Sequence, residues 1–139
     1  MPTTAEASLN RLLTQMEKSA RFARASVRRA VAEFGTGWET DFTELLANLY
    51  GSDSALEEAV KGYGAFVMDS MRRQKRFDQE LRYPAKTYAE VACEVYHNAE
   101  YMRRQYLTGL LLSHYLWAHH YRQIEYFRPS SCLGCCASE

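Results

Sequence analysis

The sequence predicts an all-α domain of about five helices packed as an irregular bundle, followed by a disordered, cysteine-rich C-terminal tail. Three observations predict this class. The 139 residues include only seven glycines and three prolines, too few helix breakers for a many-turned β fold. Apolar residues make up 47% of the chain, which is enough for a globular core. The apolar positions recur at intervals of three and four residues, the spacing of one helix face.

Turn and capping signals divide the chain into predicted helices at residues 4–34, 38–50, 54–81, 85–97 and 99–127. Thr3–Glu6 and Ser54–Glu57 have the spacing of capping boxes, in which a hydroxyl is followed three residues later by a carboxylate. Gly35 is a natural left-handed terminator of the first helix. Pro84 should stop the third helix, because the residue before proline avoids the α region. Asn98 is the expected N-cap of the last helix.

Apolar side chains mark the faces that these helices should bury. The second helix carries them at Trp38, Phe42, Leu45, Leu46 and Leu49, and the third at Leu56, Val60, Tyr63, Val67 and Met71. Gly62 and Gly64 weaken the third helix, so they predict either a bend or close packing against another helix. The last helix is apolar around much of its circumference between residues 107 and 117. We therefore expect it to be the central, most buried helix.

The domain organisation expected from this pattern is one helical domain, residues 1–128, and a flexible tail, residues 129–139. Cys132, Cys135 and Cys136 of the tail resemble half of a zinc knuckle, but a structural zinc site needs four ligands. The N-terminus lacks the apolar segment of a secretory signal. No apolar stretch reaches the ~20 residues of a membrane-spanning helix. The chain is therefore expected to be cytoplasmic, with no membrane partner.

The formal net charge of zero argues against a protein that coats nucleic acid, which would carry a strong basic excess. The basic residues are nevertheless unevenly spread. One run comprises Arg72, Arg73, Lys75 and Arg76. Such a run is typical of a solvated helix face, and the alternative is a surface for phosphate or an acidic partner.

Glu94 and His97 form a Glu-x-x-His pair, which places both side chains on one face of a helix. Ferritin-like di-iron proteins use this spacing twice, together with two further glutamates. The pair occurs once here. A metal site is therefore an alternative that would need further ligands, such as Glu90 or a histidine of the last helix.

The last helix also concentrates histidines and aromatic residues. His114 and His119 are five residues apart, about 140° around a continuous helix, and His120 is six residues beyond His114. A common metal is therefore not expected. Tyr115, Trp117 and Tyr121 interleave with the histidines, and these rings form either an aromatic core or the wall of a pocket for a small organic ligand.

Residues 88–127 carry a recognisable combination of motifs. These are Asn98, Glu100, Tyr101 and Met102, then Gly109 to Ser113, then Leu116 to Tyr121. The stretch resembles the helical N-terminal region that precedes the catalytic domain in a group of bacterial class I S-adenosylmethionine-dependent methyltransferases. The resemblance implies that His119, His120 and Tyr121 face a substrate, with Tyr115 and Trp117 beside them.

The same resemblance implies a cofactor-binding domain after Phe127, where this sequence has the cysteine-rich tail instead. The expected function is therefore a helical substrate-binding, lid or dimerisation segment that has no cofactor site and is not catalytic alone. Its partners would be a small-molecule substrate or a catalytic methyltransferase domain, with a homodimer as a further possibility. The alternatives are a stand-alone module that binds a small apolar ligand or a partner helix, and a metal-binding protein that uses Glu94 and His97.

Overall fold

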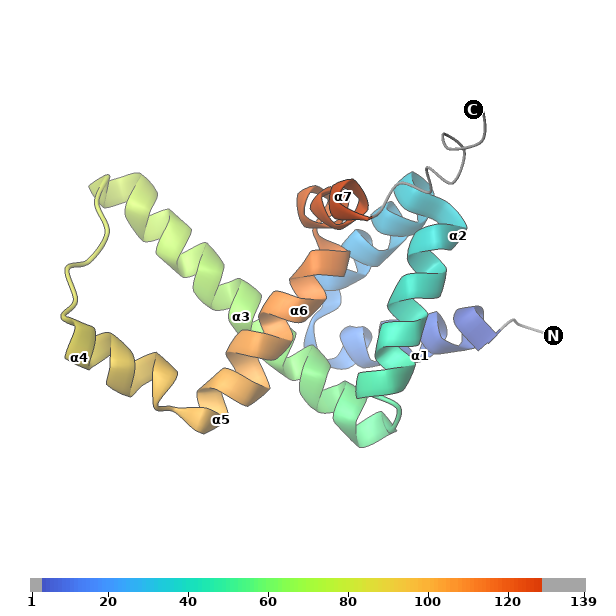
Figure 1. The fold of residues 1–139 in the computed structure, drawn as a ribbon, viewed down its shortest axis with the longest axis horizontal. Coiled ribbons are helices and arrows are strands. Elements are labelled where there is room, and N and C mark those ends of the chain that lie inside the picture. Colours follow the sequence, from blue (N-terminus) through green and yellow to red (C-terminus); the bar gives the residue numbers. More distant parts are fainter. Residues whose placement is uncertain (1–3, 129–139) are drawn as a thin grey trace, which may run out of the picture.

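The computed structural model describes residues 4–128, which form helices joined by short turns and contain no strand (Figure 1). The α-helices are α1 (Thr4–Ser19), α2 (Arg24–Leu49), α3 (Asp53–Glu80), α4 (Tyr88–Val91), α5 (Ala99–Tyr101), α6 (Leu107–Leu116) and α7 (Ala118–Phe127). A 3-10 turn, η1 (Arg21–Ala23), precedes α2, and π-helical turns η2 (Ala92–Tyr96) and η3 (Met102–Tyr106) follow α4 and α5. The predicted all-α class is confirmed. The expected capping box at Thr3 and the cysteine-rich tail lie outside the described residues.

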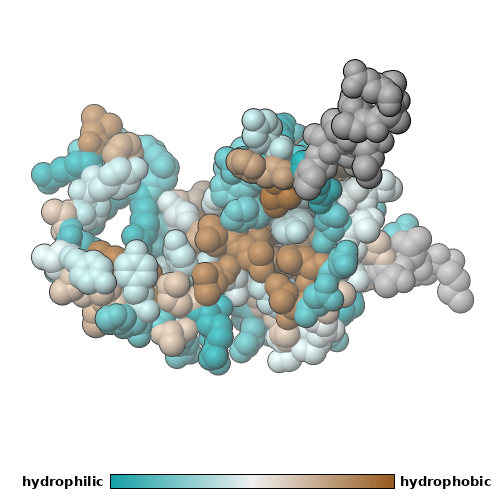
Figure 2. All heavy atoms as spheres, viewed as in Figure 1, coloured by the Kyte–Doolittle hydropathy of each residue, from teal (hydrophilic) through white to brown (hydrophobic). Residues whose placement is uncertain are grey.

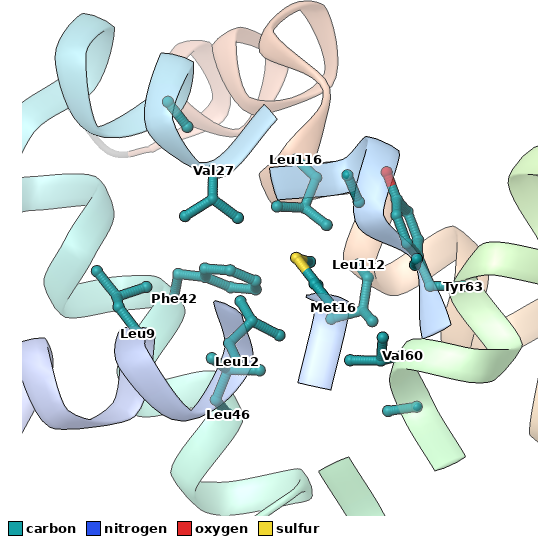
Figure 3. Packing of buried hydrophobic residues seen from close by; sticks show 14 of the residues in the cluster. Leu9, Leu12, Met16, Val27, Phe42, Leu46, Val60, Tyr63, Leu112 and Leu116 are labelled. Carbon is teal, nitrogen blue, oxygen red and sulfur yellow. The ribbon is translucent and has the colours of Figure 1, made fainter. Parts of the chain in front are cut away.

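The core lies where α1, α2, α3, α6 and α7 meet. Figure 3 shows side chains from α1, α2, α3 and α6 converging in it. The largest fully buried side chains are Trp38, Tyr63, Tyr121, Phe42, Leu12, Met16, Leu56 and Leu112. They come from both ends of the sequence. Their burial is the main source of stability, because transfer of apolar surface out of water dominates folding.

The predicted continuous helix over residues 4–34 is wrong. The chain leaves the helical region at Ala20, where φ is −151° and ψ is 54°. An unbroken helix of that length would span about 45 Å, at 1.5 Å per residue, and could not keep its whole apolar stripe against one small core. The bend at Ala20 lets Met16 of α1 and Val27 of α2 face the same interior. Gly35 was expected to end a helix; it has a positive φ of 63° and kinks α2, which continues to Leu49.

Three predicted helix boundaries are corrected and one is confirmed. The N-cap of α3 is Ser52, whose hydroxyl accepts a hydrogen bond from the Ala55 backbone N–H at 3.1 Å, and not Ser54. Helix α4 begins at Tyr88, behind a capping box formed by Thr87 and Glu90, and not at residue 85. The predicted last helix is broken at Trp117. Asn98 caps α5, with its side-chain oxygen 3.0 Å from the Tyr101 nitrogen.

Residues 68–106 form an arm that extends away from the core (Figure 1). The far half of α3 is its outgoing limb, and α4, η2, α5 and η3 return towards α6. Leu81 ends α3 in the left-handed region, with φ 52°. Met71 was expected to be buried but is 61% exposed, because α3 has already left the core beyond Val67.

No helix between residues 4 and 128 combines the length and apolar character needed to cross a membrane.

Candidate functional site on helices α6 and α7

The break at Trp117 organises the region in which the sequence placed its substrate-facing residues. Trp117 adopts an extended conformation, with φ −105° and ψ 114°, and it separates α6 from α7. Its indole N–H donates to the Tyr63 hydroxyl at 3.1 Å. Burial raises the pKa of that hydroxyl to about 12, although this hydrogen bond acts in the opposite direction. This hydrogen bond holds the segment between α6 and α7 against α3.

Tyr115 and Tyr121 are built into the core. The Tyr121 side chain is buried, and its hydroxyl donates to the Asp41 carboxylate at 2.9 Å. The Tyr115 ring stacks on Phe42, with centroids 5.0 Å apart, and lies 5.8 Å from the Tyr121 ring. Burial is the largest cause of the raised pKa of both tyrosines. These two predicted site residues therefore fix the positions of α6 and α7.

Trp117 and His119 line an open crevice of about 230 Å³ between the α6–α7 break and the first half of α2. Ser26, Arg29 and Ala30 form its opposite wall. The indole offers an apolar surface, while the guanidinium and the imidazole offer hydrogen-bond donors. Of the five predicted substrate-facing residues, these two are therefore placed around a cavity.

The histidines lie closer together than their spacing on a continuous helix predicted. The break turns the chain so that the His120 ring is 5.1 Å from the His114 ring and 4.3 Å from the His119 ring. His114 Nδ1 lies 2.7 Å from the Leu110 carbonyl oxygen, and His120 Nδ1 lies 3.3 Å from the Ser113 hydroxyl. The pKa of His120 is lowered, first by burial and then by His119 and His114.

This cluster predicts that folding weakens under mild acid. Because His120 has a pKa below its ordinary value of 6.5 in the folded chain, the unfolded chain binds the proton more readily. The resulting stability is present above about pH 6.5 and is lost as the pH falls through the lower folded pKa. Urea unfolding at pH 7.5 and pH 5.5 should show a fall in stability that is smaller in His120→Asn. His97→Asn is the control, because His97 is exposed and outside the cluster, and an equal fall in all three proteins would contradict the prediction.

Half of the residues of α6 are buried, a larger share than in any other α-helix between residues 4 and 128, as expected for this part of the predicted last helix. The buried residues all lie on one side of α6. Thr108, Gly109, Leu112, Ser113 and Leu116 face the core. Leu107, Leu110, Leu111 and His114 lie on the opposite side and are exposed or half-buried. We call these four residues the α6 apolar face. Figure 2 shows a hydrophobic patch over α6 that reaches towards α2.

A second cavity continues this face along α7. It has a volume of about 540 Å³ and is lined by His114, Gln123, Ile124, Phe127 and Arg128. Neither the α6 apolar face nor this cavity was predicted from the sequence. The all-round apolar character of residues 107–117 was interpreted as that of the central, most buried helix. The same apolar character equally fits a helix that packs one side on the core of its own chain and leaves the other side free for a partner.

The proposed metal pair gains no further support from the described part of the chain. Glu94 and His97 are both exposed, on or directly after the π-helical turn η2. Glu94 forms an ion pair with Lys86. Between residues 4 and 128, no three His, Cys, Asp or Glu side chains are placed to hold one metal ion. The metal-binding alternative stays a prediction.

Comparisons with protein-family models, with characterised proteins and with solved structures found no match to this chain. The function is therefore inferred from the geometry of α6 and α7.

Proposed function

We propose that this chain is the helical, substrate-side segment of a methyltransferase and that it acts together with a separate catalytic domain. The observation that carries this proposal is the α6 apolar face. A helix that is apolar on all sides is normally enclosed on all sides. Here one side packs on the chain's own core, and residues 4–128 cover the opposite side only in part, with Leu107 51% exposed and Leu111 half-buried.

The position of this face favours a protein partner. It lies within residues 88–127, the stretch that resembles the methyltransferase helical region. It also continues into the cavity lined by Ile124 and Phe127. Exposed apolar patches with a polar rim are typical of protein interaction sites. The α6 apolar face would contact the catalytic domain, and the crevice at Trp117 and His119 would contribute to the substrate pocket.

The first test is cofactor binding. Calorimetric titration of S-adenosylmethionine into the isolated chain is expected to give no binding, since the cofactor site belongs to the partner. Micromolar binding by this chain alone would overturn the proposal.

The second test is partner capture in the native host, with cross-linking and mass spectrometry. The wild-type chain is expected to capture a class I methyltransferase domain, and Leu107→Lys should abolish the capture. Phe22→Lys is the matched control, because Phe22 of η1 (48% exposed) is about as accessible as Leu107 (51% exposed). Capture of only a second copy of the chain would overturn the methyltransferase assignment in favour of a self-associating module. Equal capture by both variants would exclude the α6 apolar face as the contact.

A further inference from the structure

The outer end of the arm contains a cavity whose chemistry differs from that of the α6–α7 region. The cavity has a volume of about 450 Å³, within the range of small-ligand sites. Its lining consists of Asp69, Arg72, Arg73, Arg76, Phe77, Arg82, Tyr83, Pro84 and Lys86. The turn at residues 81–87 brings four of these residues back against α3. Cationic residues that are separate in the sequence are thereby gathered around one space.

The cationic groups outnumber the carboxylates that contact them. Arg73 pairs with Asp69 at 2.8 Å, and Lys86 pairs with Glu94. Arg76 and Arg82 share Glu80, at 3.0 and 4.0 Å.

Arg72 has no ion pair within the described residues. Five cations thus face three carboxylates, which leaves an excess of two positive charges. The existing pairs are largely exposed, so an incoming anion can compete for the guanidinium groups.

Two aromatic rings stand beside these cations. The Phe77 and Tyr83 rings stack with centroids 4.6 Å apart and an interplanar angle of 25°. Tyr83 is 76% exposed, so one ring remains accessible. Arginine binds phosphate through paired N–H donors, and a planar ligand gains further from contact with an accessible aromatic ring.

We propose that this cavity binds a small phosphomonoester that carries an aromatic ring. A phosphomonoester has a charge of about −1.5 to −2 near neutral pH, which matches the excess of two positive charges. The cavity has room for one mononucleotide-sized ligand. A nucleic-acid strand would need a longer basic stripe, and the charge excess is confined to this end of the arm. The proposal does not depend on the methyltransferase assignment.

Isothermal titration of the full chain with adenosine 5′-monophosphate at low ionic strength tests the proposal. One equivalent is expected to bind, and adenosine and inorganic phosphate should each bind at least about tenfold more weakly, since each lacks one half of the recognition. Tyr83→Ala should weaken binding of the nucleotide and leave phosphate binding unchanged. Absence of nucleotide binding, or tighter binding of a ten-residue oligothymidine than of the monophosphate, would overturn the proposal.

Arg72→Gln and Lys75→Gln provide the matched comparison. Both residues are exposed on α3, and each substitution removes one positive charge, but only Arg72 lines the cavity. Arg72→Gln is expected to weaken nucleotide binding about tenfold, the effect of losing a charged hydrogen bond. Lys75→Gln should change it less than about twofold. Equal losses in the two variants would indicate general electrostatic attraction and would refute a defined site.

Discussion

Trp38→Ala should destabilise the chain by about 3–5 kcal/mol, the usual cost of removing a fully buried tryptophan side chain. Trp38 is 0% exposed, and its ring lies 4.9 Å from the Phe42 ring. A domain of this size is typically stable by about 5–15 kcal/mol, so the substitution should remove much of the total. Urea unfolding followed by far-ultraviolet circular dichroism measures the loss without relying on tryptophan fluorescence.

The hydrogen bond of Trp38 adds a second part to this prediction. Its indole N–H donates to the Tyr115 backbone carbonyl at 2.8 Å. Tyr115 is in the last turn of α6, where carbonyl groups have no partner within the helix. Trp38 therefore donates a hydrogen bond to a carbonyl group that has no partner within α6, because the helix ends before Trp117. Trp38→Phe keeps most of the apolar contact and loses this bond, so it should cost about 1–2 kcal/mol.

Trp38→Phe also keeps the prediction measurable if Trp38→Ala does not fold. Phe22→Ala is the control for removing an aromatic ring outside the core. It should change the free energy of unfolding by less than about 0.5 kcal/mol. A loss below 1 kcal/mol in Trp38→Ala would contradict the packing of α2 against α6 described above.

The sequence predicts the helical class and several helix ends, because these depend on local signals. Asn98 has a side chain that suits an N-cap, and Gly35 takes up a positive φ at little cost. The breaks at Ala20 and Trp117 were missed because neither position has a glycine or proline. The break at Trp117 is accompanied by a tertiary contact, the hydrogen bond to Tyr63. Periodicity within one segment carries no information about such a contact.

The candidate site was only partly predictable for the same reason. The sequence indicated a region rich in aromatic residues and histidine, and Trp117 and His119 do line a crevice. The expected separation of His114 and His120 assumed a continuous helix, whereas the break between them brings their rings to 5.1 Å. The free side of α6 could not be predicted, because hydrophobicity alone does not say whether the covering residues belong to the same chain. The basic cavity requires the return of residues 81–87 against α3, which no local motif encodes.

Gly62→Ala is expected to destabilise the chain by about 2 kcal/mol, although alanine favours a helix more than glycine does. A Cβ atom at Gly62 would lie 1.9 Å from the Arg104 backbone carbonyl oxygen. Because that neighbour is backbone, no rotamer change can relieve the overlap, and the two segments must separate. Overpacking of this kind typically costs about 1–3 kcal/mol.

Gly37→Ala is the matched control, because a Cβ atom there meets nothing within 4 Å. The same chemical change should stabilise α2 by up to about 1 kcal/mol through helix propensity. Opposite signs for the two variants in urea unfolding would support the close approach of α3 and η3, and equal stabilisation would contradict it. Gly62 lies where the returning limb of the arm crosses α3. The contact that it permits therefore fixes where the returning limb packs on α3.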